Sequence, residues 1–401
     1  MAATRTLAVV GASLAGLRAV EAMRREGFDG RIALIGAESE RPYDRPPLSK
    51  EVLRGERAPE TTALAKPEAF DALDLELHLG TRATALDPHA RRIATDRGES
   101  IAYDGCLIAT GATPRRIPDT PPLAGIHVLR TLGDCAALRA ELERGPRVAV
   151  VGGGFIGAEV AATCRARGLE VAIVEALPQP MSLALGETLG AVLAALHRDH
   201  GVDLRCGVGV EGFAGAGGRV ERVQLADGSS VAADVVVVGI GVVPETAWLE
   251  GSGIALGNGV VCDETLATSL PGVCAAGDVA RWPNPQFGEV MRIEHWTNAV
   301  EQGEHAAAAL VTGEAKPFST VPYVWSDQYD RKIMSAGRPR PDDELRVFHG
   351  SLEARQFVAL YGRKGRLVAA LAMNRARHLM TYRRMIREGA SFEAACAAAE
   401  G

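Results

Sequence analysis

Short apolar runs alternate with amphipathic stretches over the first two thirds of the chain. The runs 6–10, 31–36, 148–151 and 171–174 are rich in Val, Ile, Leu and Ala, which is typical of strands buried on both faces of a parallel sheet. A stretch with helical spacing follows the first and the third run. This alternation of buried strands and helices predicts an α/β fold.

A glycine-rich turn follows the run 148–151. Gly152, Gly154 and Gly157 have G-x-G-x-x-G spacing, with Phe155 and Ile156 before the last glycine. In a strand–turn–helix unit this spacing lets backbone N–H groups and the helix N-terminus approach the pyrophosphate of a dinucleotide. Similar turns occur as ordinary loops, so the pattern alone leaves both interpretations open.

A second turn of this kind follows the run 6–10. Its residues are Gly11, Ser13, Leu14, Ala15 and Gly16. Ser13 stands where the middle glycine is expected and carries a Cβ at the point where the backbone approaches phosphate, which departs from the pattern. Two such units in one chain predict two bound nucleotides.

An acidic residue follows each turn by about twenty residues, close to the end of the next apolar run. These residues are Glu38 and Glu175. A carboxylate at this place accepts a hydrogen bond from the ribose 2′-OH of a dinucleotide. No arginine follows Glu175 in 176–179, so a 2′-phosphate would meet a like charge there, and we expect NADH rather than NADPH.

The layout of the first half of the chain recurs in the second. Residues 81–108 and 220–244 both predict short strands around a turn and end in an apolar strand with glycines. The chain therefore contains two related nucleotide-binding units. From 318 onward the pattern changes to strands joined by hairpins, followed by helices over 375–387 and 391–399, which predicts a separate small α+β domain.

Two further segments are expected to lie near a cofactor. The prolines of 41–50 predict a stiff extended segment carrying Arg45 and Lys50, although a plain connector has the same composition. An alanine-rich helix ends at about Val311, and we expect Asn298 with Glu301, or else Thr297, to cap its start.

Composition limits the class of protein. The chain has 401 residues, of which 47% are hydrophobic and 23% charged, as expected for a globular protein of two or three domains. The longest apolar run, 235–243, is too short to span a bilayer, and no leader-like segment opens the chain, so we expect a cytoplasmic protein without a membrane partner. The seven cysteines are scattered singly, which favours reduced core residues and no metal site.

The net charge of −6 is unevenly distributed. Residues 331–387 contain 14 Lys and Arg against 4 acidic residues, a local net charge of about +10. An acidic partner and a solvated basic face without a partner both explain this window. No motif of a nucleic-acid-binding module is present, so no nucleic-acid partner is expected.

The chain resembles a known family over almost its whole length. It is similar to the FAD-dependent, NADH-oxidising ferredoxin reductases of cytochrome P450 and Rieske dioxygenase systems, within the glutathione-reductase-like flavoprotein superfamily. The runs that carry the resemblance are 45–50 (RPPLSK), 109–111 (ATG), 152–157 (GGGFIG), 276–278 (AGD), 294–296 (EHW) and 325–328 (WSDQ).

The resemblance implies an α/β fold with two Rossmann-like domains of the glutathione-reductase type and a C-terminal α+β domain. The implied FAD-binding domain is discontinuous and covers 1–112 and 243–316. The implied NADH-binding domain covers 113–242, and the C-terminal interface domain covers 317–401.

The resemblance also implies roles for individual residues. Gly11, Ser13, Gly16 and Glu38 would hold the adenosine and pyrophosphate of FAD, Arg45 and Lys50 would border it, Asp278 would bond the ribityl chain, and Trp296 would lie by the isoalloxazine. The catalytic pair would be Lys50 and Glu159, near flavin N5. The further cofactor-binding residues would be Leu14, Ala15, Thr110, Gly111, Glu294, His295 and Trp325. Those at and around the turn 152–157 would be Gly152, Gly154, Phe155, Ile156, Gly157, Glu159, Glu175 and Gly241.

The absence of a cysteine before Cys106 selects within this superfamily. Disulfide reductases need a redox dithiol near the flavin, and NADH peroxidases and oxidases of this type need one reactive cysteine there. We therefore expect hydride transfer from NADH to FAD N5, and then single electrons to an acidic [2Fe–2S] ferredoxin that feeds a P450 or Rieske oxygenase. The expected protein is a monomer or weak dimer.

The docking face is expected to include residues of the basic window, namely Arg331, Lys332, Arg375, Arg377, Arg383 and Arg384. Three alternatives stay open at this stage. They are a reductase of rubredoxin, an NADH oxidase that needs no carrier, and a flavin-binding signalling protein in which NADH only switches conformation.

Overall fold

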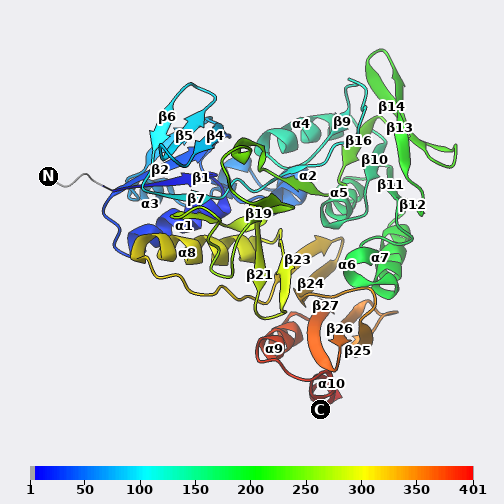
Figure 1. Ribbon diagram of the computed structural model, residues 1–401. Coiled ribbons are helices and arrows are strands. Elements are labelled where there is room, and N and C mark those ends of the chain that lie inside the picture. The colour runs from blue at the N-terminus through cyan, green and yellow to red at the C-terminus, as the bar shows by residue number, and fades with distance from the viewer. Residues whose placement is uncertain (1–4, 401) are drawn as a thin grey trace. The chain divides into compact units, whose positions relative to one another are not determined.

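The computed structural model describes residues 5–400, and the chain forms two compact units of mixed α/β structure (Figure 1). Unit 1 contains the chain up to Asp44, Thr62–Thr113 and Val243–Pro322. Unit 2 contains Arg45–Thr61, Pro114–Val242 and the chain from Tyr323 onward. Parallel sheets in both units confirm the predicted fold class.

Unit 1 is built on a five-stranded sheet in which every neighbouring pair is parallel. Its order is β20 (Val273–Ala275), β7 (Gly105–Ile108), β1 (Thr6–Val10), β2 (Arg31–Gly36) and β3 (Glu76–Leu79). Helices α1 (Leu14–Arg25) and α8 (Trp296–Thr312) lie side by side on one face of this sheet (Figure 1). The approach is close because Gly303 has no side chain, since a Cβ there would lie 2.5 Å from the Ala15 carbonyl oxygen.

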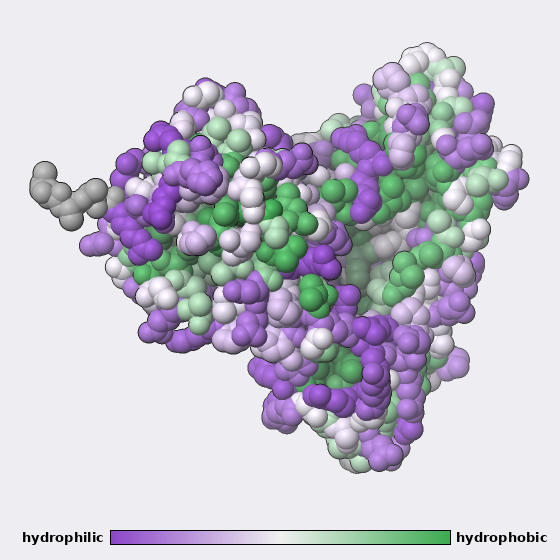
Figure 2. Space-filling model, in the orientation of Figure 1, coloured by the Kyte–Doolittle hydropathy of each residue, from purple (hydrophilic) through white to green (hydrophobic). Residues whose placement is uncertain are grey.

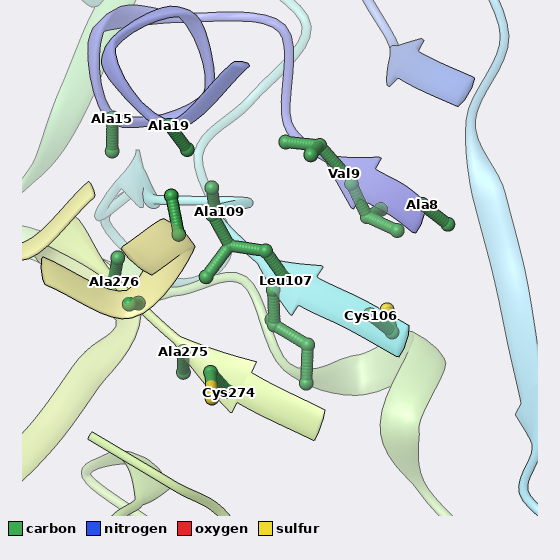
Figure 3. Close-up of a cluster of buried hydrophobic side chains, with 14 of the residues drawn as sticks. Ala8, Val9, Ala15, Ala19, Cys106, Leu107, Ala109, Cys274, Ala275 and Ala276 are labelled. Carbon is green, nitrogen blue, oxygen red and sulfur yellow. The ribbon is translucent and has the colours of Figure 1, made fainter. Parts of the chain in front are cut away.

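Small residues fill the space between α1 and the sheet. Ala15 and Ala19 on α1 face the ends of two neighbouring strands, where Ala109 and Ala276 follow β7 and β20 (Figure 3). All four side chains are buried. Close packing of this kind holds the N-terminus of α1 at the carboxyl edge of the sheet, where open α/β sheets bind their ligands.

Unit 2 repeats the arrangement. Its parallel sheet has the order β12 (Asp203–Cys206), β11 (Val171–Glu175), β10 (Val148–Val151), β16 (Val235–Val238) and β9 (Ile126–His127). The central strand of each sheet leads into a glycine turn and a helix, which is α5 (Phe155–Ala166) in unit 2. The predicted duplication is confirmed. The two sheets differ in one edge strand. The edge strand beside β7 in unit 1 is β20, which comes late in the chain of that unit, whereas the edge strand beside β16 in unit 2 is β9, which comes early.

Each unit also contains a three-stranded antiparallel sheet, which lies in the chain between β3 and β7 in unit 1 and between β12 and β16 in unit 2, as the two hairpin patterns predict. In unit 1 it consists of β4 (Ala83–Asp87), β5 (Arg92–Thr95) and β6 (Ser100–Ala102). In unit 2 it consists of β13 (Val210–Ala216), β14 (Arg219–Leu225) and β15 (Ser230–Ala232).

The C-terminal segment forms an antiparallel sheet with two helices. The strand order is β23 (Tyr323–Gln328), β24 (Arg331–Gly337), β27 (Arg366–Met373), β26 (Gln356–Arg363) and β25 (Glu344–Ser351), and the helices are α9 (Ala376–Arg387) and α10 (Phe392–Glu400). These elements match the predicted ones. Their core is shared with two helices of unit 2, because Ile333 and Phe357 belong to one buried cluster with Ala158 of α5 and Leu193 of α7 (Glu187–Asp199).

The remaining elements are short, apart from two helices of unit 2. In unit 1 they are α3 (Pro67–Asp71), η3 (Ala247–Leu249), β18 (Leu256–Gly257), β19 (Gly259–Val261), η4 (Gly277–Val279), β21 (Ala280–Asn284) and β22 (Glu289–Met291). In unit 2 they are η1 (Pro46–Ser49), α2 (Glu51–Arg54), η2 (Pro59–Thr62), whose last residue lies across the unit boundary, α4 (Leu132–Leu142), α6 (Ser182–Leu185) and α7 (Glu187–Asp199). The chain passes between the units within β8 (Ala112–Pro114) and β17 (Val242–Pro244).

Three expectations differ from the structure. The segment 41–50, predicted to be extended, contains the 3-10 helix η1 between Arg45 and Lys50, because proline suits the first positions of a helical turn. Helix α8 begins at Trp296 with His295 as its N-cap, so neither Asn298 nor Thr297 caps it, and the amide of Asn298 instead donates to the Ile293 carbonyl at 3.1 Å. The segment Arg45–Thr61 groups with unit 2, whereas the predicted boundaries place it in the FAD-binding domain. The three-domain division itself stays a prediction.

Within residues 5–400, no helix is both long and apolar enough to cross a bilayer. The same residues contain no group of three or more His, Cys, Asp or Glu side chains that could hold a metal ion.

Candidate functional site

The first and last glycines of both turns are required by the protein's own backbone. Gly11 and Gly152 have φ of +125° and +101°, a region that side chains rarely adopt. A Cβ on Gly16 would lie 2.0 Å from the Gly11 carbonyl oxygen, and one on Gly157 would lie 2.1 Å from that of Gly152. The two turns therefore have the same geometry, and each brings its helix tightly against its strand.

The middle position of each turn has a different requirement. A Cβ on Gly154 would meet no protein atom within 4 Å, and Ser13 already carries a Cβ at the matching position of unit 1. No neighbouring protein atom therefore requires a glycine at this place, and the space beside it is open. A pyrophosphate that approaches the backbone needs such a space.

The helices that follow the turns are open to an anion. Neither α1 nor α5 has a side chain bonded to its first backbone N–H groups, although α4 is closed by a capping box of Thr131 and Asp134. The uncapped N–H groups belong to the first helical residues, which include Leu14 and Ala15 in unit 1 and Phe155 and Ile156 in unit 2. Together with the open space at the middle position, both turns fit a dinucleotide pyrophosphate.

The Glu175 carboxylate lies at the second turn and is buried. It accepts hydrogen bonds from the backbone N–H of Gly153 at 2.7 Å and of Leu177 at 2.8 Å. Glu175 therefore fixes the loop on either side of the place where a ribose is expected.

The acid of the first turn lies at a different register position. Val10 pairs with Ile35 as Val151 pairs with Val174, so Gly36 matches Glu175 and Glu38 lies two residues further along. The hydroxyl of Tyr43 donates to the Glu38 carboxylate. The two acids are thus not equivalent in position, although both follow the strand next to their turn.

The other predicted residues of unit 1 are held by local contacts. Thr110 Oγ1 donates to the Glu245 carbonyl at 2.8 Å, next to Gly111 at φ +69°. Trp296 Nε1 donates to the Asp44 carboxylate at 2.8 Å.

The turn that carries Asp278 is fixed by its neighbours. The N–H of Gly277 donates to Gln302 Oε1 at 2.8 Å, and Arg292 donates to the Asp278 carbonyl at 3.0 Å. Arg292 also forms an ion pair with Glu294 at 2.7 Å. Gln302, which sequence reasoning missed, could have been recognised only from this contact, because one glutamine in an alanine-rich helix carries no pattern.

Lys50 and Glu159 form a buried ion pair within unit 2, with Lys50 Nζ 2.9 Å from Glu159 Oε2. Glu159 lies one turn into α5, and only 3% of it is exposed. The same carboxylate accepts from Ser49 Oγ at 2.5 Å and from Ser326 Oγ at 2.8 Å. Sequence reasoning missed both serines, although they lie within the runs 45–50 and 325–328 that carry the resemblance.

The segment that contains Lys50 is fastened to unit 2 by several contacts. Thr163 Oγ1 donates to the Ser49 carbonyl at 2.7 Å, and Arg45 donates to the Arg130 carbonyl at 2.7 Å. Arg45 and Lys50 are therefore grouped with the second turn. Trp325 and Gly241 also lie in unit 2, where the Trp325 ring is tilted against Tyr323 with centroids 6.1 Å apart and Gly241 has φ +92°.

The surroundings of the cysteine thiols disfavour their ionisation. All seven are free. Burial raises the pKa of the Cys135 thiol to about 11 and the pKa values of Cys164, Cys262 and Cys274 to about 12. Burial also raises the pKa values of the remaining three, Cys106, Cys206 and Cys396. A thiol must ionise to act as a nucleophile, so none of them is poised for disulfide chemistry.

Two parallel-sheet units, each with a dinucleotide turn, define an oxidoreductase of the class that binds two nucleotide cofactors. The chain belongs to the pyridine nucleotide-disulphide oxidoreductase family, whose model matches residues 5–303. A second family model, reductase C-terminal, matches residues 323–401. The protein is therefore an oxidoreductase that uses FAD and NAD(H), as predicted.

Individual relatives match over nearly the whole chain. Rhodocoxin reductase of Rhodococcus erythropolis is 36% identical over 382 residues, which cover 95% of this chain and 89% of that protein. The ferredoxin–NAD(+) reductase component of an anthranilate 1,2-dioxygenase system from Burkholderia cepacia is 38% identical over 388 residues, with coverage of 95% and 94%. The structure is similar to putidaredoxin reductase in its covalent complex with putidaredoxin, with a TM-score of 0.93, 30% identity and coverage of 99% of both chains.

Proposed function

We propose that the protein is an NADH-dependent ferredoxin reductase that delivers single electrons to a [2Fe–2S] ferredoxin of a P450 or Rieske oxygenase system. The observation that carries the proposal is the state of the thiols. In a family named for disulphide chemistry, all seven cysteines here are free, and burial raises the pKa of each thiol, which disfavours the thiolate that disulfide exchange needs. The electrons need another outlet, and the relatives named above are reductases of small redox proteins.

The residues of unit 1 fit FAD. Gly11, Ser13 and Gly16 would bring backbone N–H groups of α1 to the pyrophosphate, and Glu38 would accept from the adenosine ribose. Asp278 would bond the ribityl chain, and Trp296 would lie by the isoalloxazine. The remaining contacts would come from Leu14, Ala15, Thr110, Gly111, Glu294 and His295.

The residues of unit 2 fit NADH. Gly152, Gly154 and Gly157 would cradle the pyrophosphate with the first turn of α5, where Phe155 and Ile156 lie. Glu175 is already fixed by two backbone N–H groups and would accept from the ribose hydroxyl. A 2′-phosphate would bring a second negative charge against this buried carboxylate, so NADPH would be disfavoured.

Lys50 and Glu159 would lie beside the nicotinamide, with Arg45, Trp325 and Gly241 nearby. When bound, NADH supplies a hydride and FAD accepts it and releases electrons one at a time. The ion pair provides a cation whose position is fixed by a buried carboxylate, and such a fixed charge stabilises negative charge that develops in a reaction. Because the pair is buried, little water competes with it.

The proposed partner is an acidic protein that docks on the basic C-terminal segment. Polar residues dominate the face of this segment seen in Figure 2. Much of its positive charge is neutralised locally, since Arg346 pairs with Glu344 at 2.7 Å, Arg363 with Asp343 at 2.6 Å, and Arg331 with Asp330 at 3.4 Å. These arginines therefore add little to an attractive surface.

Three further arginines lie on one stripe of α9, and one of them, Arg384, is paired over 3.9 Å with Glu388. Arg377, Met380, Arg384 and Arg387 recur at helical spacing and are exposed, and Met380 is 51% exposed. Three arginines around an apolar side chain are a typical docking surface for an acidic protein. Arg375 and Arg383 are engaged internally, with the His349 carbonyl and the Tyr323 ring, and are better seen as supports of this surface.

We place the protein in the cytoplasm, as a monomer or weak dimer. The seven cysteines are all free, which suits a reducing compartment.

The proposal is tested by NADH-dependent reduction of cytochrome c with and without a purified [2Fe–2S] ferredoxin. We expect at least a tenfold higher rate with ferredoxin, and bleaching of the flavin absorbance when NADH is added alone. If the protein reduces a purified rubredoxin faster than the ferredoxin, the assigned partner would be a rubredoxin instead of a ferredoxin. Rapid oxygen consumption without any carrier, or an NADH-reduced flavin that passes electrons to no acceptor, would overturn the proposal.

A further inference from the structure

We propose that Ser326, on the first strand of the C-terminal sheet, is a positioning residue that holds the Glu159 carboxylate and, through it, Lys50. The inference rests on the proposed function, because it assigns a task to the C-terminal segment on the NADH side of the reaction. This task is separate from partner docking. It follows from the contacts around one buried carboxylate.

Each oxygen of the Glu159 carboxylate has its own donors. Oε2 accepts from Lys50 Nζ and Ser49 Oγ, whereas the contact to Oε1 is the hydroxyl of Ser326, at 2.8 Å. A carboxylate turns about the bond that joins it to its side chain, so donors at one oxygen alone leave this rotation open. Ser326 fixes the second oxygen and thereby the plane of the group.

Gln328 sets the direction of this hydrogen bond. Its Nε2 donates to Ser326 Oγ at 3.2 Å. A serine hydroxyl has one proton to donate and accepts through its lone pairs. Because Ser326 accepts from Gln328, its own proton is directed to Glu159. The two hydrogen bonds therefore run in one direction, from Gln328 through Ser326 to Glu159.

The strand that carries these residues presents them to α5 by simple alternation. Side chains of a strand point alternately to its two faces, and on β23 Ser326 and Gln328 are fully buried while Trp325 and Asp327 are not. An apolar residue would be expected at a fully buried strand position that serves packing alone. Two polar side chains at these positions, one bonded to the buried charge and one bonded to its partner, indicate that they serve to hydrogen-bond this charge rather than to pack the core.

The cluster joins three separate stretches of unit 2. Lys50 and Ser49 come from the segment Arg45–Thr61, Glu159 from α5, and Ser326 from β23. A hydrogen bond to a charged group contributes about 1.5–3 kcal/mol, so the loss of one donor is enough to let the carboxylate turn. Lys50 would then lose its fixed position beside the nicotinamide.

The test is a double-mutant cycle on the FAD-loaded protein, with Ser326→Ala, Glu159→Gln and the double variant. The rate of flavin reduction by NADH is measured by stopped flow. We expect Ser326→Ala to lower this rate about tenfold, which corresponds to about 1.4 kcal/mol. In the Glu159→Gln background the same substitution should change the rate less than twofold, because there is no longer a carboxylate to position. Equal effects in both backgrounds would overturn the proposal.

Two further measurements separate positioning from general damage. A crystal structure of Ser326→Ala should show the Glu159 carboxylate rotated from its place against Lys50, and an unmoved carboxylate would contradict the proposal. The matched control is Ser335→Ala, which removes a buried hydroxyl from the neighbouring strand β24, and it should reduce flavin at the unchanged rate. If NADH does not reduce the flavin of the wild-type protein, that result would instead overturn the proposed function.

Discussion

The carboxylate of Glu175 accepts a hydrogen bond from the backbone N–H of Gly153, 22 residues earlier in the chain. One side chain therefore joins the end of β11 to the glycine turn, and it does so at the place where the ribose of NADH is expected. The loop shape and the cofactor preference thus depend on the same group.

Replacing Glu175 with Ala should remove both effects. We expect the KM for NADH to rise at least tenfold, because two backbone N–H groups lose their acceptor and the ribose loses its own, and we expect the ratio of NADPH to NADH activity to rise. Steady-state kinetics with both nucleotides measures this. Glu170→Ala, at an exposed position just before the same strand, is the control and should leave both values unchanged. An unaltered KM in Glu175→Ala would contradict the assignment.

The middle glycine of the second turn offers a test that separates ligand from fold. Gly154→Ala adds a methyl group where no protein atom lies within 4 Å, and the backbone there is extended, at φ −74° and ψ −177°, so the free energy of unfolding should change by less than about 1 kcal/mol. Affinity for NADH should fall because the methyl group occupies the space that a pyrophosphate needs.

The matched variant is Gly157→Ala, whose Cβ would lie 2.1 Å from the Gly152 carbonyl oxygen. It should cost roughly 2 kcal/mol or more of stability, because the helix must move away from the strand. Isothermal titration with NAD+ and urea unfolding distinguish the two variants. Equal NAD+ affinity in Gly154→Ala and wild type would show that the open space serves another purpose.

These tests start from features that were predictable without a structure. Gly152 and Gly157 follow a known spacing between a strand and a helix, so local sequence alone specified the turn and the duplicated sheet around it. The Glu159 cluster was not predictable in this way. Ser49 and Ser326 are far apart in the chain, and a single serine carries no periodic signal. Long-range contacts of this kind become visible only once the strands and helices are placed.

The start of α8 shows a second limit. Asn298 is a good N-cap residue by type, yet the helix begins two residues earlier, at Trp296. The buried side chain of Asn298 instead donates a hydrogen bond to the Ile293 carbonyl oxygen. Capping preferences describe what a residue can do, and the tertiary environment decides which of several candidates does it.

The buried ion pair predicts an asymmetric response to substitution. Lys50→Met leaves the buried Glu159 charge without its cation and should cost about 3–5 kcal/mol of stability. Adding Glu159→Gln should restore most of this loss, since the charge is then gone. The midpoint of urea unfolding, followed by circular dichroism, measures both variants.

The control for Lys50→Met is the exposed ion pair of Arg205 and Asp203, at 3.0 Å. Arg205→Met should cost less than about 1 kcal/mol, because exposed pairs are well solvated when broken. A loss at Lys50 no larger than that at Arg205 would show that the buried pair contributes little. FAD retention should remain unchanged in all three variants, because the pair lies in unit 2.

The basic stripe on α9 predicts a dependence on charge that only the partner reaction shows. Reversing two of its charges, with Arg377→Glu and Arg387→Glu combined, should lower the rate of electron transfer to an acidic ferredoxin at least tenfold at low ionic strength. The reduction of a small dye by NADH should not change. High salt should bring the ferredoxin rates of wild type and variant together.

The control for the stripe is Arg222→Glu on β14, an exposed arginine outside the C-terminal segment. Its ferredoxin rate should match that of the wild type. If Arg222→Glu slows the ferredoxin reaction as much as the double reversal does, net charge rather than a docking surface explains the effect. If neither variant slows it, the partner does not dock on α9.

His197 predicts how stability depends on pH. It lies on α7 and is fully buried against the turn after β23, where Nδ1 lies 2.8 Å from the Tyr329 hydroxyl oxygen. Burial, with a smaller effect of His200, lowers its pKa to about 4. Between pH 6.5 and about 4 the unfolded chain therefore binds a proton at this residue that the folded chain does not, so stability falls as pH falls through this window by up to about 1.4 kcal/mol per unit. Urea unfolding at pH 7, 6 and 5 measures the slope, and His197→Phe should remove this part of it.

The exposed His89 is the control, and His89→Phe should leave the slope unchanged. A slope that is the same in wild type and His197→Phe would show that His197 is protonated in the folded protein over this range.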